Sequence, residues 1–223
     1  MPSMQAFQFG LTTTGLPITA YNFGSEGPRV LILGGVHGDE IEGVWAALGL
    51  LEKFQTKFDF KVRLTLVPMF NLDGVLAKDR RNANKVDLNR NLPTKDWSPN
   101  VATERYHPGK AAGSESENHA LVKFIDSEKP KIIISLHSWK PMLNINGDCR
   151  AEAEILREHT GYIIDEDIGY PTPGSLGTYG GKEGRVPTLT YEIERGLDQA
   201  SILKTHVPAI IASLRASEKR SST

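Results

Sequence analysis

Three side chains of this sequence could together hold a metal ion. His37 and Glu40 lie in the segment HGDE, which directly follows an apolar run, and His137 follows a second apolar run, IIISL. Two imidazoles and one carboxylate are a ligand set typical of catalytic zinc sites, because three protein ligands leave a fourth position open for water. A single histidine at the end of a strand is often only a hydrogen-bonded structural residue, so the prediction rests on the three residues together.

Short apolar runs predict the strands that position these ligands. Residues 29–35 and 131–136 are continuous apolar runs rich in β-branched residues, as expected of strands buried on both faces of a sheet. Residues 61–69 and 187–193 predict two further strands. Because ligands bind outside the carboxyl ends of the strands in open α/β sheets, both histidines occupy the edge where a site is expected.

Segments with helical spacing of apolar residues separate these strands. They predict three helices, over residues 41–54, 115–126 and 197–216. The second helix opens with a capping box, in which Ser114 caps and Glu117 follows three residues later. Strands that alternate with helices indicate an α/β fold. We expect a single domain over residues 1–223, with a mixed, mostly parallel twisted sheet and helices on both faces.

A long connection interrupts the alternation. Residues 89–113 are polar and contain Pro93, Pro99 and Pro108. A connection of this length inside a compact domain is usually functional or disordered. Since it lies beside the strongest motif of the chain, we expect it to form a wall or lid of the site.

The composition excludes several classes of protein. Hydrophobic residues make up 39% and charged residues 24% of the 223 residues, unlike a disordered or membrane-embedded chain. The formal net charge of −1 gives no electrostatic reason to expect nucleic-acid or membrane partners. Residues 1–10 have neither the basic nor the apolar segment of a signal peptide, so we expect a cytoplasmic protein. The single cysteine, Cys149, excludes an internal disulfide and a thiolate zinc site, and we expect it to be inert packing.

Five motifs in this order resemble the zinc carboxypeptidase family of the carboxypeptidase A type. The motifs are HGDE at 37–40, NLDG at 71–74, VDLNRN at 86–91, SLHS at 135–138 and LTYEIE at 189–194. They cover most of residues 30–195, and their combination is far more specific than any one of them. The resemblance implies the α/β fold of that family and one zinc ion per chain.

The resemblance also implies a role for each matching residue. His37, Glu40 and His137 would bind zinc, Arg80 would stabilise the oxyanion, Asn89 and Arg90 would hold the terminal carboxylate of the substrate, and Glu192 would be the general base. These roles suit the side chains, since a guanidinium forks onto a carboxylate and a cation lowers the barrier where negative charge develops. The implied reaction is hydrolysis of the amide bond beside a C-terminal carboxylate.

Several of these positions have alternatives. Glu194 lies two residues beyond Glu192 on the same strand face and is the second candidate for the base. The arginines at positions 80, 81 and 90 could simply be solvated loop charges. Asp39 either orients the metal site or stabilises a turn.

Other positions concern substrate specificity. Tyr170 lies one position away from the place of the family's mobile tyrosine, and Tyr179 is an alternative, although either tyrosine could have a plain packing role. Leu176 matches the floor of the family's specificity pocket. Asp148 and Arg150 have the charges needed to bind a zwitterionic side chain, or else they form an exposed loop pair.

Three segments are most similar to one bacterial branch of the family, the murein peptide amidases. These segments are GYPTPGSLGTY at 169–179, AGSESENHAL at 112–121 and NANKVDLNRNLP at 82–93. This branch releases diaminopimelate from the tripeptide L-Ala-γ-D-Glu-meso-diaminopimelate during cell-wall recycling, so the resemblance implies a small peptide substrate. We keep three alternatives: a broader carboxypeptidase, an N-acyl-amino-acid deacylase of the aspartoacylase and succinylglutamate desuccinylase type, and a silent zinc module that senses wall peptides. The sequence predicts no oligomeric state.

Overall fold

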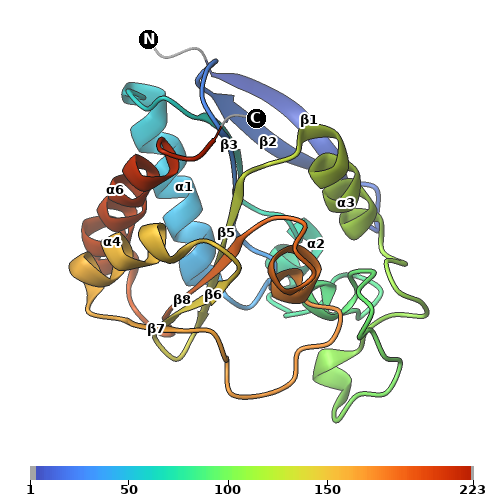
Figure 1. The fold of residues 1–223 in the computed structure, drawn as a ribbon. Coiled ribbons are helices and arrows are strands. Elements are labelled where there is room, and N and C mark those ends of the chain that lie inside the picture. Colours follow the sequence, from blue (N-terminus) through green and yellow to red (C-terminus); the bar gives the residue numbers. More distant parts are fainter. Residues whose placement is uncertain (1–3, 222–223) are drawn as a thin grey trace.

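The computed structural model describes residues 4–221, and within them eight strands form one sheet (Figure 1). The strands are β1 (Gln5–Leu11), β2 (Pro17–Phe23), β3 (Arg29–Leu33), β4 (Arg63–Val67), β5 (Ile132–Trp139), β6 (Met142–Asn146), β7 (Ile163–Asp165) and β8 (Thr188–Glu194). Their order across the sheet is β1-β2-β4-β3-β5-β8-β6-β7. The central strands β4, β3, β5 and β8 are parallel to their neighbours in that group, whereas β1, β2 and β6 join antiparallel.

The predicted mixed, mostly parallel sheet is therefore confirmed. The four strands predicted from the sequence correspond to β3, β4, β5 and β8, which are the strands at its centre. The remaining four strands, β1, β2, β6 and β7, were not expected from the sequence. β1 and β7 are the two edges of the sheet, and only one residue of β1 is buried, so neither carries a continuous apolar run.

Helices cover both faces of this sheet. The α-helices are α1 (Ile41–Thr56), α2 (Leu72–Ala77), α3 (Ser116–Glu128), α4 (Arg150–Thr160), α5 (Gln199–Ser201) and α6 (Val207–Ser217). Two π-helices span Gly177–Lys182 and Ile202–His206, and two short 3₁₀-helices span Leu88–Arg90 and Glu104–Tyr106. Among residues 4–221, no helix is both long and apolar enough to cross a membrane.

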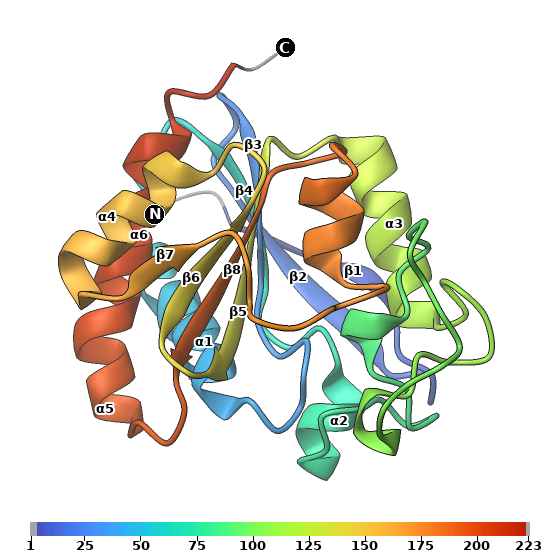
Figure 2. The same ribbon diagram turned by 60° about the horizontal axis from the view of Figure 1, so that its bottom comes forward.

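The two faces have separate apolar cores. α1, α4 and α6 lie on one face, and α3 with the π-helix Gly177–Lys182 lies on the other (Figures 1 and 2). Alternate residues of β3 show this division, since Val30 and Ile32 belong to the first core, and Leu31 and Leu33 to the second. The central strands are thus buried on both sides. Packing in both cores holds these strands, and therefore their carboxyl ends, in place within the sheet.

Two local predictions need correction. The predicted capping box is wrong, because Glu115 precedes α3 without a side-chain cap, and the Ser114 hydroxyl donates to the Glu115 carboxylate instead. The single helix expected over residues 197–216 is unbroken from Gln199 to Ser217, but its Ile202–His206 part, between α5 and α6, is a π-helix. A π-turn inserts one residue into a helix whose composition stays helical throughout, so residue types alone do not reveal it.

Candidate metal centre and cleft

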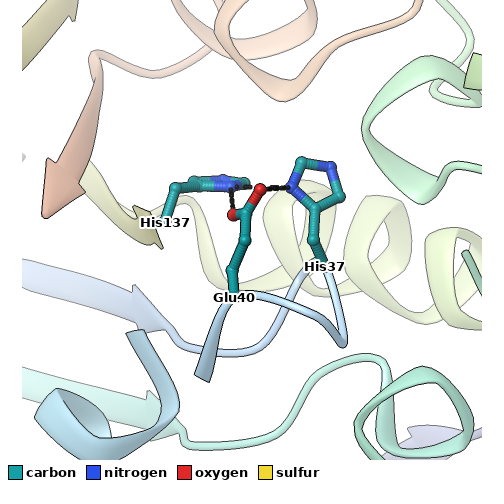
Figure 3. A group of neighbouring side chains, drawn as sticks. All are labelled: His37, Glu40 and His137. Atoms are coloured by element: carbon teal, nitrogen blue, oxygen red, sulfur yellow. Dashed lines mark hydrogen bonds and ion pairs between the residues drawn. The ribbon is translucent and has the colours of Figure 1, made fainter. Parts of the chain in front are cut away.

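His37, Glu40 and His137 converge at the carboxyl ends of β3 and β5 (Figure 3). The Glu40 carboxylate lies between the two rings, with Oε1 2.8 Å from His37 Nδ1 and Oε2 2.9 Å from His137 Nδ1. One donor atom from each residue lies within 4.8 Å of the other two, and all three side chains are buried. Burial alone would raise the pKa of Glu40, but the two histidines hold it well below its usual range. Converging nitrogen and carboxylate donors of this kind fit a zinc ion.

The HGDE loop reaches this position by packing against the NLDG segment. Gly35 has a φ of +63°, which favours glycine where the chain leaves β3. At Gly38 a Cβ atom would lie only 1.9 Å from the Gly74 carbonyl carbon, so a larger side chain would push the loop away from α2. Asn71 holds both segments, because its amide donates to the Val36 carbonyl and its Oδ1 caps α2. The NLDG motif is therefore a support for the ligand loop.

Asp87 orients His37 from the other side of the ring. Its Oδ1 lies 3.1 Å from His37 Nε2 and accepts from the Asn89 backbone N–H, and its Oδ2 accepts from Arg80 Nε at 2.8 Å. Burial would raise the pKa of Asp87, but Arg80 and His37 outweigh it and lower the pKa far below its usual range. A carboxylate here fixes the proton on Nε2 and leaves Nδ1 free to bind a metal. We did not predict this role from the sequence, although Asp87 is part of the VDLNRN motif.

Arg80 lies directly against a proposed metal ligand. Its Nη1 is 3.2 Å from Glu40 Oε1, and the ring of Tyr106 covers the guanidinium at 5.2 Å. The side chain of Arg80 is buried, which excludes the alternative that Arg80 is a solvated loop charge. A fixed cation at this place suits an oxyanion that forms beside the metal.

Glu192 lies beside His137 in the register of β5 and β8. Its Oε2 is buried and has no hydrogen-bond partner within residues 4–221. Burial raises the pKa of Glu192 to about 7. Glu192 lines the cleft, whereas Glu194 is exposed at the end of β8 and does not. The structure thus favours Glu192 as the group that exchanges a proton near neutral pH.

Asn89 and Arg90 also line the cleft. Asn89 Oδ1 accepts from the Leu176 backbone N–H at 2.8 Å, which ties this segment to the start of the π-helix. The Arg90 guanidinium lies between two aromatic rings, 5.3 Å from Tyr106 and 5.9 Å from Tyr170. The two arginines at positions 80 and 90 thus both contact the Tyr106 ring and line one cleft.

Of the predicted specificity residues, only Tyr170 has its side chain in the cleft. Leu176 is buried in the apolar core beneath α3, and it contacts the site through its backbone N–H. Tyr179 is buried in the same core under the Arg185 guanidinium, in the packing role that we had allowed. Arg150 lies at the start of α4, where its exposed side chain pairs with Glu154 and with Glu166, and only Glu166 lines the cleft.

Asp148 and Cys149 lie away from the cleft. The Asp148 backbone carbonyl accepts from Arg220, and Asp148 lines a separate groove beside α6. Cys149 is buried, and burial raises the pKa of its thiol to about 12. A thiol with so high a pKa is unreactive, which agrees with the inert role expected for it.

One end of the cleft is polar, and its residues were not predicted from the sequence. Asn144 and Asn146 point to the same face of β6, and Asn146 Nδ2 donates to Asn144 Oδ1 at 2.7 Å. Thr190 of β8 pairs with Asn144, and Lys182 at the end of the π-helix completes this end. Two asparagines spaced by two in an otherwise apolar strand were the available signal.

Residues 89–113 form the wall that the sequence predicted. The segment folds back on the VDLNRN motif, because the Asp87 N–H donates to the His107 carbonyl and Asn91 Nδ2 donates to the Pro108 carbonyl. Its 3₁₀-helix Glu104–Tyr106 places Tyr106 over both arginines of the cleft. The neighbouring Arg105 donates to Asp39, which lies in the HGDE loop.

Comparisons with known proteins agree with this geometry. The family model described as "Zinc carboxypeptidase" matches residues 2–207. The chain is 32% identical to murein peptide amidase A of Vibrio campbellii, over 93% of this chain and 86% of that protein. The crystal structure of murein-tripeptide amidase from Escherichia coli O157 has a TM-score of 0.75 at 23% identity, covering 98% and 93% of the two chains. Bovine thrombin-activatable fibrinolysis inhibitor, solved with tick carboxypeptidase inhibitor, has a TM-score of 0.82 at 18% identity, over 96% and 90%.

Proposed function

The chain belongs to the zinc carboxypeptidase family and is a zinc metallopeptidase, and from this premise we propose that it releases diaminopimelate from a murein tripeptide. The proposed substrate is L-Ala-γ-D-Glu-meso-diaminopimelate, cleaved between γ-D-Glu and diaminopimelate. One observation carries the proposal: His37 and Glu40 of the metal-binding group, the unpartnered Glu192 and the Asn89–Arg90 pair line one cleft. The choice of substrate is supported by the name of the Vibrio campbellii relative. Recycling of wall peptides would place the protein in the cytoplasm.

We propose that one zinc ion per chain is held by His37 Nδ1, His137 Nδ1 and the Glu40 carboxylate. When bound, zinc polarises a carbonyl group and lowers the pKa of water from 15.7 toward ~7. Asp87 and Ser135 contact the other ring nitrogens, at 3.1 Å from His37 Nε2 and 2.9 Å from His137 Nε2. These contacts keep both Nδ1 atoms directed at the metal.

The protein groups supply the proton transfers and the charge stabilisation. Glu192 takes a proton from the attacking water and returns it to the leaving amine, for which a pKa of about 7 is suitable. Arg80 stabilises the negative charge that develops on the carbonyl oxygen. Arg90, with the Asn89 amide, binds the α-carboxylate of the leaving residue, so that cleavage occurs next to the C-terminus.

The polar end of the cleft suits diaminopimelate as the leaving residue. Its side chain ends in an amine and a carboxylate, and Asn144, Asn146 and Lys182 offer amide and ammonium groups at this end. In this proposal Tyr170 covers the leaving residue, and Leu176 positions Asn89 through its backbone. Arg150 acts only indirectly, by pairing with Glu166 at the rim.

Release of diaminopimelate tests the proposal. The zinc-loaded protein is incubated with the tripeptide, with and without a chelator, and free diaminopimelate is measured. We expect release only without the chelator. A peptide ending in an ordinary apolar residue and an N-succinylated amino acid are the comparison substrates for the broader carboxypeptidase and for the deacylase. Faster turnover of either comparison substrate than of the tripeptide would overturn the proposed substrate.

A further inference from the structure

Two arginines share one carboxylate at the mouth of the cleft. Arg105 Nη2 and Arg195 Nη2 both lie 2.9 Å from Asp39 Oδ2, and Arg195 Nη2 also donates to the Asp39 backbone carbonyl. Within residues 4–221 no other carboxylate pairs with either arginine. One carboxylate balances only one of the two guanidinium groups, so a positive charge is left over.

The two guanidinium groups remain available to a ligand. Both residues line the same cleft as Glu40 and Glu192. Their side chains are 48% and 39% exposed, and each guanidinium has five N–H donors, of which Asp39 uses few. Asp39 also fixes where they stand, because it holds the 3₁₀-helix Glu104–Tyr106 and the residue that follows β8 against the HGDE loop. A fixed pair of half-exposed guanidiniums is a good receptor for a carboxylate.

The direction of β8 places this pair on the acyl side of the scissile bond. Asn89 is bonded to Leu176, which precedes the π-helix, and the π-helix packs on Asn146, which is paired with Thr188 at the start of β8. The leaving residue therefore lies toward the start of β8. Arg195 follows the other end of β8, so Glu192 lies between the start of the strand and Arg195.

The distance available on that side is short. A strand rises about 3.3 Å per residue, so the three steps from Glu192 to Arg195 span roughly 10 Å. An extended peptide covers at most about 3.6 Å per residue, so this distance equals about three residues, and the residue that donates the scissile carbonyl reaches the pair only through its side groups and the arginine side chains. The groups at the metal centre are thus flanked by carboxylate receptors on both sides.

We propose that Arg105 and Arg195 bind a free carboxylate carried by the acyl-side residue of the substrate. The site depends on the proposed function and defines its substrate class: peptides in which an acidic residue is linked through its side chain. A γ-linked glutamate keeps its α-carboxylate on the acyl side, whereas an ordinary α-peptide presents a neutral amide there. The pair would thereby distinguish wall-type isopeptides from ordinary peptides.

A pair of substrates that differ only in this carboxylate tests the proposal. The first is L-Ala-γ-D-Glu-meso-diaminopimelate, and the second carries a carboxamide in place of the glutamate α-carboxylate. Diaminopimelate release is measured with the zinc-loaded wild type, Arg105→Ala, Arg195→Ala and the double variant. For the wild type we expect kcat/KM to be about 10- to 100-fold higher with the carboxylate, the range for a charge-assisted contact. In the double variant the preference should fall to about one.

A matched control separates recognition from a structural role. Arg157 pairs with Glu154 on the exposed face of α4, away from the cleft, so Arg157→Ala should keep the full preference. If the arginines only fastened the loops, their removal would slow both substrates equally and leave the preference unchanged, which would overturn the proposal. Equal cleavage of both substrates by the wild type would also overturn it, while leaving the proposed function intact. Failure of the wild type to cleave either one would instead refute the proposed function.

Discussion

Replacing Asp87 with asparagine removes a charge that orients His37. Asp87 itself is not one of the proposed metal ligands. In the structure the two Asp87 oxygens serve His37 Nε2, Arg80 Nε and the Asn89 backbone N–H. An amide of the same size has only one acceptor oxygen, and its NH₂ group must face one of these donors. The variant therefore loses control of the His37 proton, of Arg80 or of both.

The expected loss follows from these contacts. A hydrogen bond to a charged group contributes about 1.5–3 kcal/mol, and 1.4 kcal/mol corresponds to a factor of ten. Loss of one such contact to His37 should weaken zinc binding by about 10- to 100-fold, the range observed for residues that orient metal ligands. Where the NH₂ group faces Arg80 instead, Arg80 keeps only Glu40 as a buried carboxylate partner, which should lower the Tm.

Zinc affinity is measured by competition with a chromogenic chelator, alongside a thermal melt. Asp79→Asn is the matched control, because Asp79 lies on the same loop and pairs with Arg81 and Lys85 without contacting His37. The control should bind zinc like the wild type. Wild-type zinc affinity in a folded Asp87→Asn protein would refute the orienting role of Asp87.

Three further predictions concern the base, the wall and the C-terminal helix. Glu192→Gln should keep zinc, measured by elemental analysis, and lose about 10²- to 10⁴-fold in kcat; wild-type turnover would exclude Glu192 as the base. Tyr106→Ala removes the ring that covers Arg80 and Arg90, so KM should rise for substrates with a free terminal carboxylate. An unchanged KM would show that the ring does not position the two arginines. Burial lowers the pKa of His206 to about 4, so between pH 6.5 and 4 the unfolded chain binds a proton at His206 and the folded chain does not. The stability of the folded protein should therefore fall as the pH drops from about 6.5 to 4. His206→Gln should flatten this part of the Tm–pH curve, and parallel curves for the two proteins would contradict the assignment.

The sequence predicted the parts of the site that are carried by local motifs. His37, Glu40 and His137 follow apolar runs that are typical of strands buried on both faces, so both the strands and the sheet edge could be predicted. Glu192 could be chosen over Glu194 only through the family motif, and burial in the cleft now gives the physical reason. The positions of these side chains could be predicted because each rests on a few neighbouring residues, and their roles stay predictions.

Contacts between distant segments could not be predicted in this way. Asp39 meets Arg105 and Arg195 across 66 and 156 positions of the sequence, and no local pattern announces such a pairing. An apolar residue such as Leu176 suits either a pocket floor or the core. The structure places the Leu176 side chain in the core beneath α3. The sequence likewise contains no signal for the extra residue in the π-helix that follows it.

The placement of the proposed metal ligands at the ends of neighbouring central strands also has a consequence for folding. His37 and His137 are 100 residues apart and meet only through the parallel pairing of β3 with β5. Parallel pairings of distant segments are slow to form, because a long loop must close before any contact rewards it. A refolding chain should therefore acquire zinc affinity late, together with the central sheet, and zinc should raise the stability of the native state without helping its earlier intermediates.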